Sequence, residues 1–522
     1  MTGIGLQIEP DQVVTVGAGP LMASDVIAVA RGGARIEVAP DGLVAIRRGR
    51  AIIDALANDA QPHYGVSTGF GALATRHIPV ELRAQLQASL IRSHAAGSGP
   101  DVEDEVVRAL MLLRLATLAT GRTGVRAETV QAYAAMLNAG ITPVVHEFGS
   151  LGCSGDLAPL AHCALALMGE GVVRDGKGGQ RPAGEALAEA GLQPVQLREK
   201  EGLALINGTD GMLGMLVLAI ADLRRLLTVA DVTAAMSVEG LLGSDAPFAA
   251  DLQALRPHPG QATAAANMRA LVAGSAIMAS HRGPECTRVQ DAYSLRCAPQ
   301  VNGAARDTLD HADLVASREL RSAIDNPVIT LDGRVESNGN FHGAPLGYVL
   351  DFLAIAVADV ASMSERRTDR FLDLARSQGL SAFLANDPGV DSGHMIAQYT
   401  QAAIVSELKR LAVPASVDSI PSSAMQEDHV SMGWSAARKL RRALDGLTRV
   451  LAIELLTAAR GIELREPLRA APATAEVIAG LRAGVPGPGQ DRFMAPEIAH
   501  AVQYVAEGGA LRAAETITGT LG

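Results

Sequence analysis

The chain has 522 residues, of which 48% are hydrophobic and 3% aromatic, and its net charge is −11. Such a chain can bury a large core of mostly aliphatic side chains, which suits closely packed helices. The acidic balance and the absence of a Lys/Arg-rich run argue against binding to nucleic acid or to an anionic membrane surface.

No segment of the sequence predicts export or membrane insertion. Residues 1–10 (MTGIGLQIEP) lack a basic stretch followed by an apolar run, so they do not predict a secretory signal. The apolar stretch 212–221 is shorter than the ~20 residues that cross a bilayer. The four cysteines form no CxxC pair, and so few in so long a chain favour a reducing compartment. We therefore expect a cytoplasmic protein.

Most of the chain is predicted to be helical. Residues 34–46 and 327–336 have weak strand character, whereas 105–120 and 212–229 are long apolar stretches that predict buried helices. Leucines recur at helical spacing over 440–455, and the glycine- and proline-rich residues 483–489 predict a loop. The basic residues of that leucine-containing helix are interpreted as its solvent-exposed face; they are Arg438, Lys439, Arg441 and Arg442.

Polar, glycine-rich segments interrupt these predicted helices. A helical bundle does not need such segments for packing, and loops held by a rigid scaffold often carry chemistry. The segments are 64–72, 93–99, 149–159, 207–211, 290–296, 338–343 and 426–429.

The segment 149–162 (GSLGCSGDLAPLAH) contains a tripeptide that can form an electrophile, Cys153-Ser154-Gly155. In a tight turn, the amide nitrogen of Gly155 can attack the carbonyl carbon of Cys153, because glycine has no side chain to block the approach. Loss of that oxygen as water, and of a second water from Ser154, would give a methylidene-imidazolone (MIO). Two alternatives remain: a plain glycine-rich turn, or a Cys153 thiolate with His162 as its base.

The segment 149–162 resembles the signature of the aromatic amino acid lyases, whose usual tripeptide is Ala-Ser-Gly. Cys153 departs from that pattern, but it gives only its carbonyl to the ring, so cyclisation is still expected. The resemblance covers nearly the whole chain, in blocks that follow the family's order. They are YGVSTGFG (64–71), INGTDGM (206–212), VQDAYSLRCAPQ (289–300), GNFHG (339–343) and QEDHVSMG (426–433).

The resemblance implies the architecture and the cofactor. We expect a mainly α-helical protein with an N-terminal, electrophile-bearing domain over residues 1–205 and a bundle of long helices over 206–522. The family forms homotetramers in which loops of several subunits build each active site. MIO would be the prosthetic group, with no external organic cofactor. Because no HExxH or comparable ligand spacing occurs, we predict no catalytic metal.

The resemblance also assigns catalytic roles. Tyr64 matches the general base that removes the β-proton, within a loop that would act as a lid and exclude water. Arg296 matches the residue that holds the substrate carboxylate, for which a guanidinium fork is suited, although such an arginine alone is more often part of a structural ion pair. Tyr293 lies on the same face as Arg296 if the segment is helical, and it matches a tyrosine near the MIO ring.

Three further matches are assigned to binding. Asn207 and Gln290 match polar residues that hydrogen-bond the prosthetic group or the substrate. Phe341 matches an aromatic residue that packs beside the electrophile. All three lie in the glycine-rich segments or directly beside them.

Two positions indicate the substrate. His94 falls where the family reads the substrate side chain, but tyrosine lyases also carry histidine there. Glu427 stands where phenylalanine and tyrosine lyases usually lack an acid, and a carboxylate can accept the N–H of an imidazole. Together they favour L-histidine, deaminated to trans-urocanate and ammonia in the first step of histidine degradation. Glu427 could instead be a buried acid paired with an arginine.

Three other functions remain as alternatives. A tyrosine ammonia-lyase or an aromatic amino acid aminomutase would use the same scaffold. A fumarase- or aspartase-type lyase would carry a GSSxMPxKxNP loop, which this sequence lacks. An inactive relative acting as a binding protein would most simply have lost Ser154 or Tyr64, and both are present.

Overall fold

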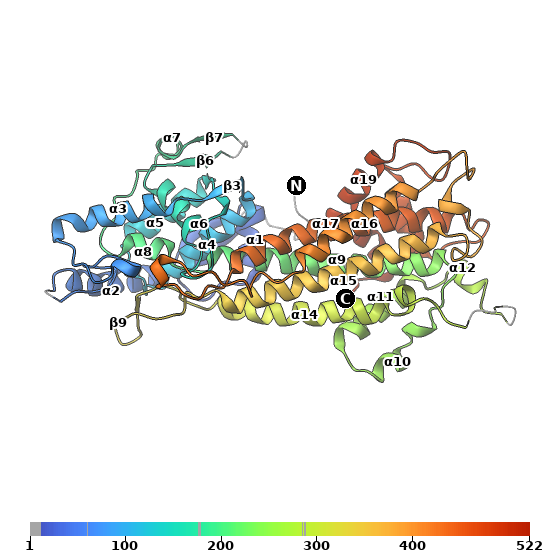
Figure 1. Ribbon diagram of the computed structural model, residues 1–522, viewed down its shortest axis with the longest axis horizontal. Coiled ribbons are helices and arrows are strands. Elements are labelled where there is room, and N and C mark those ends of the chain that lie inside the picture. Colours follow the sequence, from blue (N-terminus) through green and yellow to red (C-terminus); the bar gives the residue numbers. More distant parts are fainter. Residues whose placement is uncertain (1–11, 60, 176–178, 284–285, 287–288) are drawn as a thin grey trace.

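The computed structural model describes residues 12–59, 61–175, 179–283, 286 and 289–522. The molecule is elongated and mainly helical, with short strands near one end (Figure 1), so the expected fold class is confirmed. Residues 1–10, interpreted above as lacking a secretory signal, lie outside the described residues.

The helices range from one turn to more than eight turns in length. They are α1 Ala23–Gly32, α2 Pro40–Ala57, α3 Arg83–His94, α4 Asp104–Ala119, α5 Ala127–Asn138, α6 Leu157–Leu167, α7 Ala183–Glu189, α8 Glu201–Ile206, α9 Asp210–Gly240, α10 Ala250–Ala254, α11 Pro259–Leu271, α12 Ala276–Ala279, α13 Tyr293–Arg296, α14 Ala298–Glu319, α15 Ala344–Leu372, α16 Met395–Leu411, α17 Gly433–Glu463, α18 Pro472–Arg482, α19 Ala495–Ala506 and α20 Gly509–Thr518.

The strands are short and pair in small groups. β1 Val13–Val16 runs parallel to β2 Arg35–Val38. The remaining pairs are antiparallel: β3 Ser98–Asp101 with β5 His146–Phe148, β4 Thr142–Pro143 with β6 Val172–Arg174, β6 with β7 Gln180–Pro182, and β8 Val328–Ile329 with β9 Val335–Glu336.

The predicted strands are confirmed in part. Within 34–46 only β2 is extended, because Pro40 occupies the first turn of α2, where its fixed φ suits a helix and its missing N–H costs nothing. Within 327–336 both β8 and β9 form. The loop predicted over 483–489 joins α18 to α19.

A bundle of long helices forms the body of the molecule. α9 packs against α4, α14, α15 and α17, while α15 also contacts α14, α16 and α17. The N-terminal elements gather at one end of this bundle, and α10 to α12 and α18 to α20 lie at the other (Figure 1). α9 has 31 residues, which at 1.5 Å per residue makes it about 46 Å long. The division between residues 205 and 206 stays a prediction.

Two helical stretches are apolar and long enough to cross a bilayer by length and composition. One combines α8 and α9, and its most apolar window is 100% buried in the protein. The other is α15, whose window is 61% buried. The apolar character of the first stretch is therefore that of a buried core helix, since other helices surround it.

The interpretation of the basic residues in α17 as a solvent-exposed face is confirmed for Arg442, which is exposed, and is wrong for the other three. Arg438, Lys439 and Arg441 are mostly buried, and all four basic side chains form ion pairs. The reason is that N-terminal elements and α15 pack against this end of α17 and present carboxylates to it. The partners are, in order, Glu103, Asp351, Glu105 and Glu147.

Candidate active site

The tripeptide lies in a tight turn between β5 and α6. Gly155 has φ +78°, a conformation that favours glycine. A Cβ at this position would lie 2.0 Å from the Gly208 oxygen, so only glycine fits. Gly152 also has a positive φ, and its Cβ would lie 2.2 Å from the Ser431 hydroxyl oxygen. The chain is thus folded tightly on both sides of Ser154.

Hydrogen bonds fix this turn to two other segments, 208–212 and the one that carries Ser431. The Asp156 carboxylate accepts hydrogen bonds from the Gly211 and Met212 amides, each at 2.9 Å, at the N-terminus of α9. The Asp156 amide donates to the Gly208 carbonyl at 2.7 Å. On the other side, the Gly152 carbonyl accepts from the Ser431 hydroxyl at 2.7 Å. The turn is therefore held by segments that are distant in sequence, as a strained backbone requires.

Replacing Gly155 by alanine is expected to block ring formation and to destabilise the fold. The positive φ alone costs ~1–2 kcal/mol for an L side chain, and the methyl group would overlap backbone. Intact-mass measurement should show that water is not lost, and thermal unfolding should shift to lower temperature. Gly140→Ala is the matched control, because Gly140 has φ +69° and open space around its Cβ. A Gly155→Ala protein lighter by two water molecules would contradict the tight-turn argument.

Glu427 contacts the tripeptide directly. The Ser154 hydroxyl and the Cys153 thiol each donate to a different carboxylate oxygen of Glu427, both at 3.0 Å. Ser422 donates to the same carboxylate at 3.0 Å. Glu427 forms no ion pair within the described part of the chain, so the alternative of a structural acid paired with an arginine has no support here.

The charge of the Glu427 carboxylate affects the pKa of both Tyr64 and His94. Burial raises the pKa of Tyr64 above 10.0, and the charge of Glu427 raises it further. The Gly71 N–H donates to the phenol oxygen at 3.2 Å and lowers the pKa in part. Burial lowers the pKa of His94, at the end of α3, while the Leu90 backbone and Glu427 oppose that shift. Residues from three separate segments thus converge on the surroundings of Ser154.

The thiolate alternative for Cys153 is not supported. Burial, and to a smaller extent the contact with Glu427, raises the pKa of the thiol to about 12, so the thiol stays protonated near neutral pH. His162 is not available as its base, because its Nε2 accepts a hydrogen bond from the Gly97 amide at 3.1 Å.

Asn207 lies beside the turn, in a segment held by buried charges. Its side-chain amide donates to the Asn326 carbonyl at 2.9 Å, and its backbone carbonyl accepts from Arg114 at 2.8 Å. Lys200 and Asp325 form a buried ion pair at 2.5 Å in the same region. The roles of Arg114, Lys200 and Asp325 were not predicted from the sequence. Charged residues within or beside apolar segments were the available signal, since such charges are buried only when paired.

Phe341 belongs to a segment that reaches the turn from another direction. Two residues later, the Gly343 amide donates to the Gly152 carbonyl at 3.1 Å. His342 stacks on His429 with ring centroids 5.5 Å apart, which joins this segment to the one that carries Glu427. Phe341 is half-buried.

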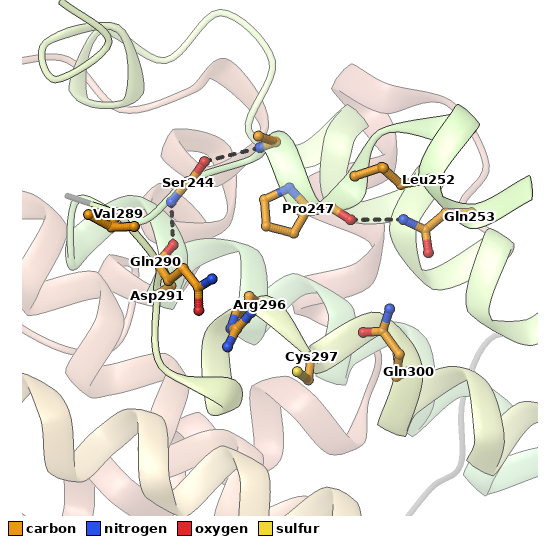
Figure 2. A pocket seen from close by; sticks show the side chains of 11 residues that line it. Ser244, Pro247, Leu252, Gln253, Val289, Gln290, Asp291, Arg296, Cys297 and Gln300 are labelled. Atoms are coloured by element: carbon orange, nitrogen blue, oxygen red, sulfur yellow. Dashed lines mark hydrogen bonds between the residues drawn. The ribbon is translucent and has the colours of Figure 1, made fainter. Parts of the chain in front are cut away.

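The other predicted residues lie in a second cluster. Tyr293 and Arg296 are on α13, as the helical interpretation required, with the guanidinium 4.7 Å from the ring centroid. Gln290 and Arg296 line a cavity of about 460 Å³, whereas Tyr293 is 70% exposed. Figure 2 shows Arg296, Gln290 and Cys297 facing the segment that carries Pro247 and Leu252 across this cavity.

The two clusters lie at opposite ends of α9. The tripeptide is held at its N-terminus through Asp156, whereas Ser244, just beyond its C-terminus, donates its amide to Asp291 at 2.6 Å. The length of α9, about 46 Å, therefore separates Ser154 from Tyr293 and Arg296 within one chain. Within one chain, the turn at Ser154 is approached by Tyr64, His94, Asn207 and Glu427, and by the segment that carries Phe341, but not by Gln290, Tyr293 or Arg296.

Among the described residues, no group of three or more His, Cys, Asp or Glu side chains is arranged to hold a metal ion. The absence of a catalytic metal stays a prediction.

Comparison with known proteins gives a consistent result. Residues 21–483 match the family model described as aromatic amino acid lyase. The chain is 67% identical to a histidine ammonia-lyase of Streptomyces avermitilis and 66% identical to one of Streptomyces griseus; each alignment covers 97% of this chain and 99% of the relative.

Solved structures show the same fold. A tyrosine aminomutase from Streptomyces globisporus matches with a TM-score of 0.92 and 38% identity, over 98% of this chain and 100% of that one. A histidine ammonia-lyase from Trypanosoma cruzi matches with a TM-score of 0.88 and 38% identity, over 97% and 96% of the two chains. Because the family model and the close relatives both cover nearly all of it, this chain belongs to the aromatic amino acid lyase family.

Proposed function

We propose that the protein is a carbon–nitrogen lyase that converts L-histidine to trans-urocanate and ammonia, the first step of histidine degradation. The observation that carries this proposal is the position of the Glu427 carboxylate, 3.0 Å from the Ser154 hydroxyl and electrostatically coupled to His94. An acid there can accept the imidazole N–H and stabilise positive charge on the ring. The close relatives named histidine ammonia-lyase support the same reaction.

The prosthetic group is proposed to be MIO formed from Cys153, Ser154 and Gly155. The residues fit this group: the turn is tight, its glycine cannot be replaced without overlap, and Ser154 keeps a hydroxyl that can leave as water. Once formed, MIO supplies an electrophile that activates the amino acid for loss of ammonia. No external organic cofactor is then needed.

The remaining chemistry falls to side chains of this protein. Tyr64 is proposed as the base for the β-proton, His94 and Glu427 as the groups that hold the imidazole, and Phe341 as packing beside the electrophile. Arg296 would bind the carboxylate through its fork of donors, with Tyr293 and Gln290 beside it.

The protein is proposed to act as a homotetramer in the cytoplasm. Two observations support assembly. Arg296 and Ser154 lie at opposite ends of α9, so a complete site needs a second subunit. The long helix α15 also leaves apolar side chains exposed on one face, Tyr348, Phe352 and Ile355, at spacings of four and three residues. No nucleic acid or membrane partner is proposed.

Substrate choice can be tested by ultraviolet absorbance of the purified protein with L-histidine, L-tyrosine or L-phenylalanine. We expect urocanate from histidine and little product from the others. Coumarate from tyrosine, or a β-amino acid, would instead favour a tyrosine ammonia-lyase or an aminomutase. Absence of product from all three would overturn the proposed reaction.

Glu427→Gln is expected to reduce histidine turnover while leaving the fold intact. A charge-assisted hydrogen bond contributes ~1.5–3 kcal/mol, so kcat/KM should fall at least ~10–100-fold. Steady-state kinetics and thermal unfolding would be measured together. The matched control is Asp428→Asn, which removes an exposed acid at the next position. A rate equal to wild type would reduce Glu427 to a structural role.

A further inference from the structure

The two oxygens of the Glu427 carboxylate have different hydrogen-bond donors. Oε1 accepts from the Ser154 hydroxyl at 3.0 Å. Oε2 accepts from the Ser422 hydroxyl and from the Cys153 thiol, each at 3.0 Å. The hydroxyl is the stronger of these two donors, because a thiol S–H is a weak one. Oε2 is thus held mainly by Ser422, which belongs to the same segment as Glu427 itself.

A tight backbone turn brings Ser422 next to Glu427. The Ser422 N–H donates to the Glu427 carbonyl at 2.9 Å, and the Glu427 N–H donates to the Ser422 carbonyl at 3.3 Å. Between them, Ser423, Ala424 and Met425 have φ values of +51°, +51° and +68°. Residues with side chains rarely adopt this conformation, and where they do they are often found at functional sites. The turn therefore sets Ser422 beside the carboxylate independently of the electrophile loop.

Ring formation would change the surroundings of only one of the two oxygens. The proposed cyclisation removes the Ser154 hydroxyl together with the α-hydrogen of Ser154 as water. Oε1 then loses the one donor that it has among the described residues. The Ser422 hydroxyl and the Cys153 thiol take no part in the cyclisation, so Oε2 keeps both of its donors. The mature site therefore presents Oε1 as an acceptor that needs a new donor.

We infer that Ser422 is a positioning residue, which holds Oε2 of Glu427 so that Oε1 faces the substrate and accepts the N–H of its imidazole ring. A carboxylate that is held in place before the ligand arrives loses less freedom on binding. An imidazole supplies an N–H donor, whereas a phenyl ring supplies none. Ser422 would thus favour histidine without touching it. This inference rests on the proposed function and deepens it by naming the oxygen that reads the ring.

The test is a binding cycle in Ser154→Ala protein, which lacks the same hydroxyl and, without the methylidene, should not turn ligands over. Calorimetry would give Kd for L-histidine and L-phenylalanine, which differ only in the ring. Ser422→Ala in this background should reduce the preference for histidine ~3–10-fold, the usual contribution of one hydrogen bond. Ser422→Thr keeps the hydroxyl and should keep the preference. The matched control is Ser423→Ala, at the exposed neighbouring serine, which should leave the preference unchanged.

A second cycle asks whether Ser422 acts through Glu427. Glu427→Ala should itself remove the preference for histidine, and adding Ser422→Ala should then change nothing further, because residues of one hydrogen-bond network are not additive. An undiminished preference in Ser422→Ala, equal behaviour of the threonine and alanine variants, or a further loss in the Glu427→Ala background would each overturn the inference. Equal weakening of both ligands by Ser422→Ala would assign Ser422 to the fold alone and overturn it too.

Failure of the proposed function would look different. The Ser154→Ala protein with Ser422 and Glu427 intact would then show no preference for histidine but would prefer tyrosine to phenylalanine. The phenol O–H would be the donor to Oε1, and the same cycle with tyrosine and phenylalanine would decide the role of Ser422, with the same expected and contrary outcomes. No preference for either donor-bearing ring over phenylalanine would overturn the inference as well.

Discussion

Ser154→Ala is expected to reduce turnover of L-histidine by several orders of magnitude, while the protein folds normally. Alanine has no hydroxyl to lose, so the methylidene carbon cannot form even if the backbone cyclises. Intact-mass measurement should show wild-type protein lighter than its encoded sequence by two water molecules, and the variant lighter by at most one. Among the described residues, the hydroxyl hydrogen-bonds only Glu427, so its loss should cost little stability.

Cys153→Ala is the matched control for this result. Cys153 would give only its carbonyl to the ring, and its thiol stays protonated because burial raises its pKa to about 12. We expect this variant to lose two water molecules and to keep most of its activity. A fully active Ser154→Ala protein would rule out the electrophile, and an inactive Cys153→Ala protein with an intact ring would reopen a role for the thiol.

The sequence was sufficient to place the electrophile end of the site, because its residues belong to short, recognisable blocks. The structure brings the segments that carry Tyr64, His94, Asn207 and Glu427 to the turn at Ser154, although 363 positions separate the first and last of these residues. Their catalytic roles stay predictions.

Features that depend on long-range packing were not predictable from local patterns. The ion pairs of α17 need carboxylates from α4, α15 and β5, or from residues beside them, and a basic helical segment alone looks solvent-exposed. The partner of Lys200 is 125 residues away and becomes evident only when both are buried together. The separation of Arg296 from Ser154 follows from the length of α9, which has 31 residues. Periodicity predicts this segment as a helix but does not show that the two parts of the site lie at its opposite ends.

Tyr64→Phe is expected to fold normally and to lose kcat by at least the ~10²–10⁴-fold that general base catalysis contributes. Among the described residues, the phenol oxygen makes one hydrogen bond, from the Gly71 amide, so stability should change little. Phe70→Leu is the control for packing, because the Phe70 ring contacts Tyr64 edge-to-face at 6.5 Å while carrying no base. That variant should keep most of its activity. A Tyr64→Phe rate close to wild type would remove Tyr64 as the base.

The pH dependence gives a second measure of the same role. A tyrosine base must be deprotonated, so kcat/KM should rise with pH through the pKa of Tyr64 and be lost as pH falls below it. In the single chain, burial and the charge of Glu427 raise this pKa above 10.0, which is unfavourable for a base near neutral pH. We expect Arg296 of another subunit to lower it in the assembled site, because an adjacent cation stabilises the phenolate. Dissociated subunits should therefore be inactive, and Arg296→Gln should shift the rising limb of the profile to higher pH as well as raise KM. An unshifted limb in Arg296→Gln would assign the activation of Tyr64 to another cation.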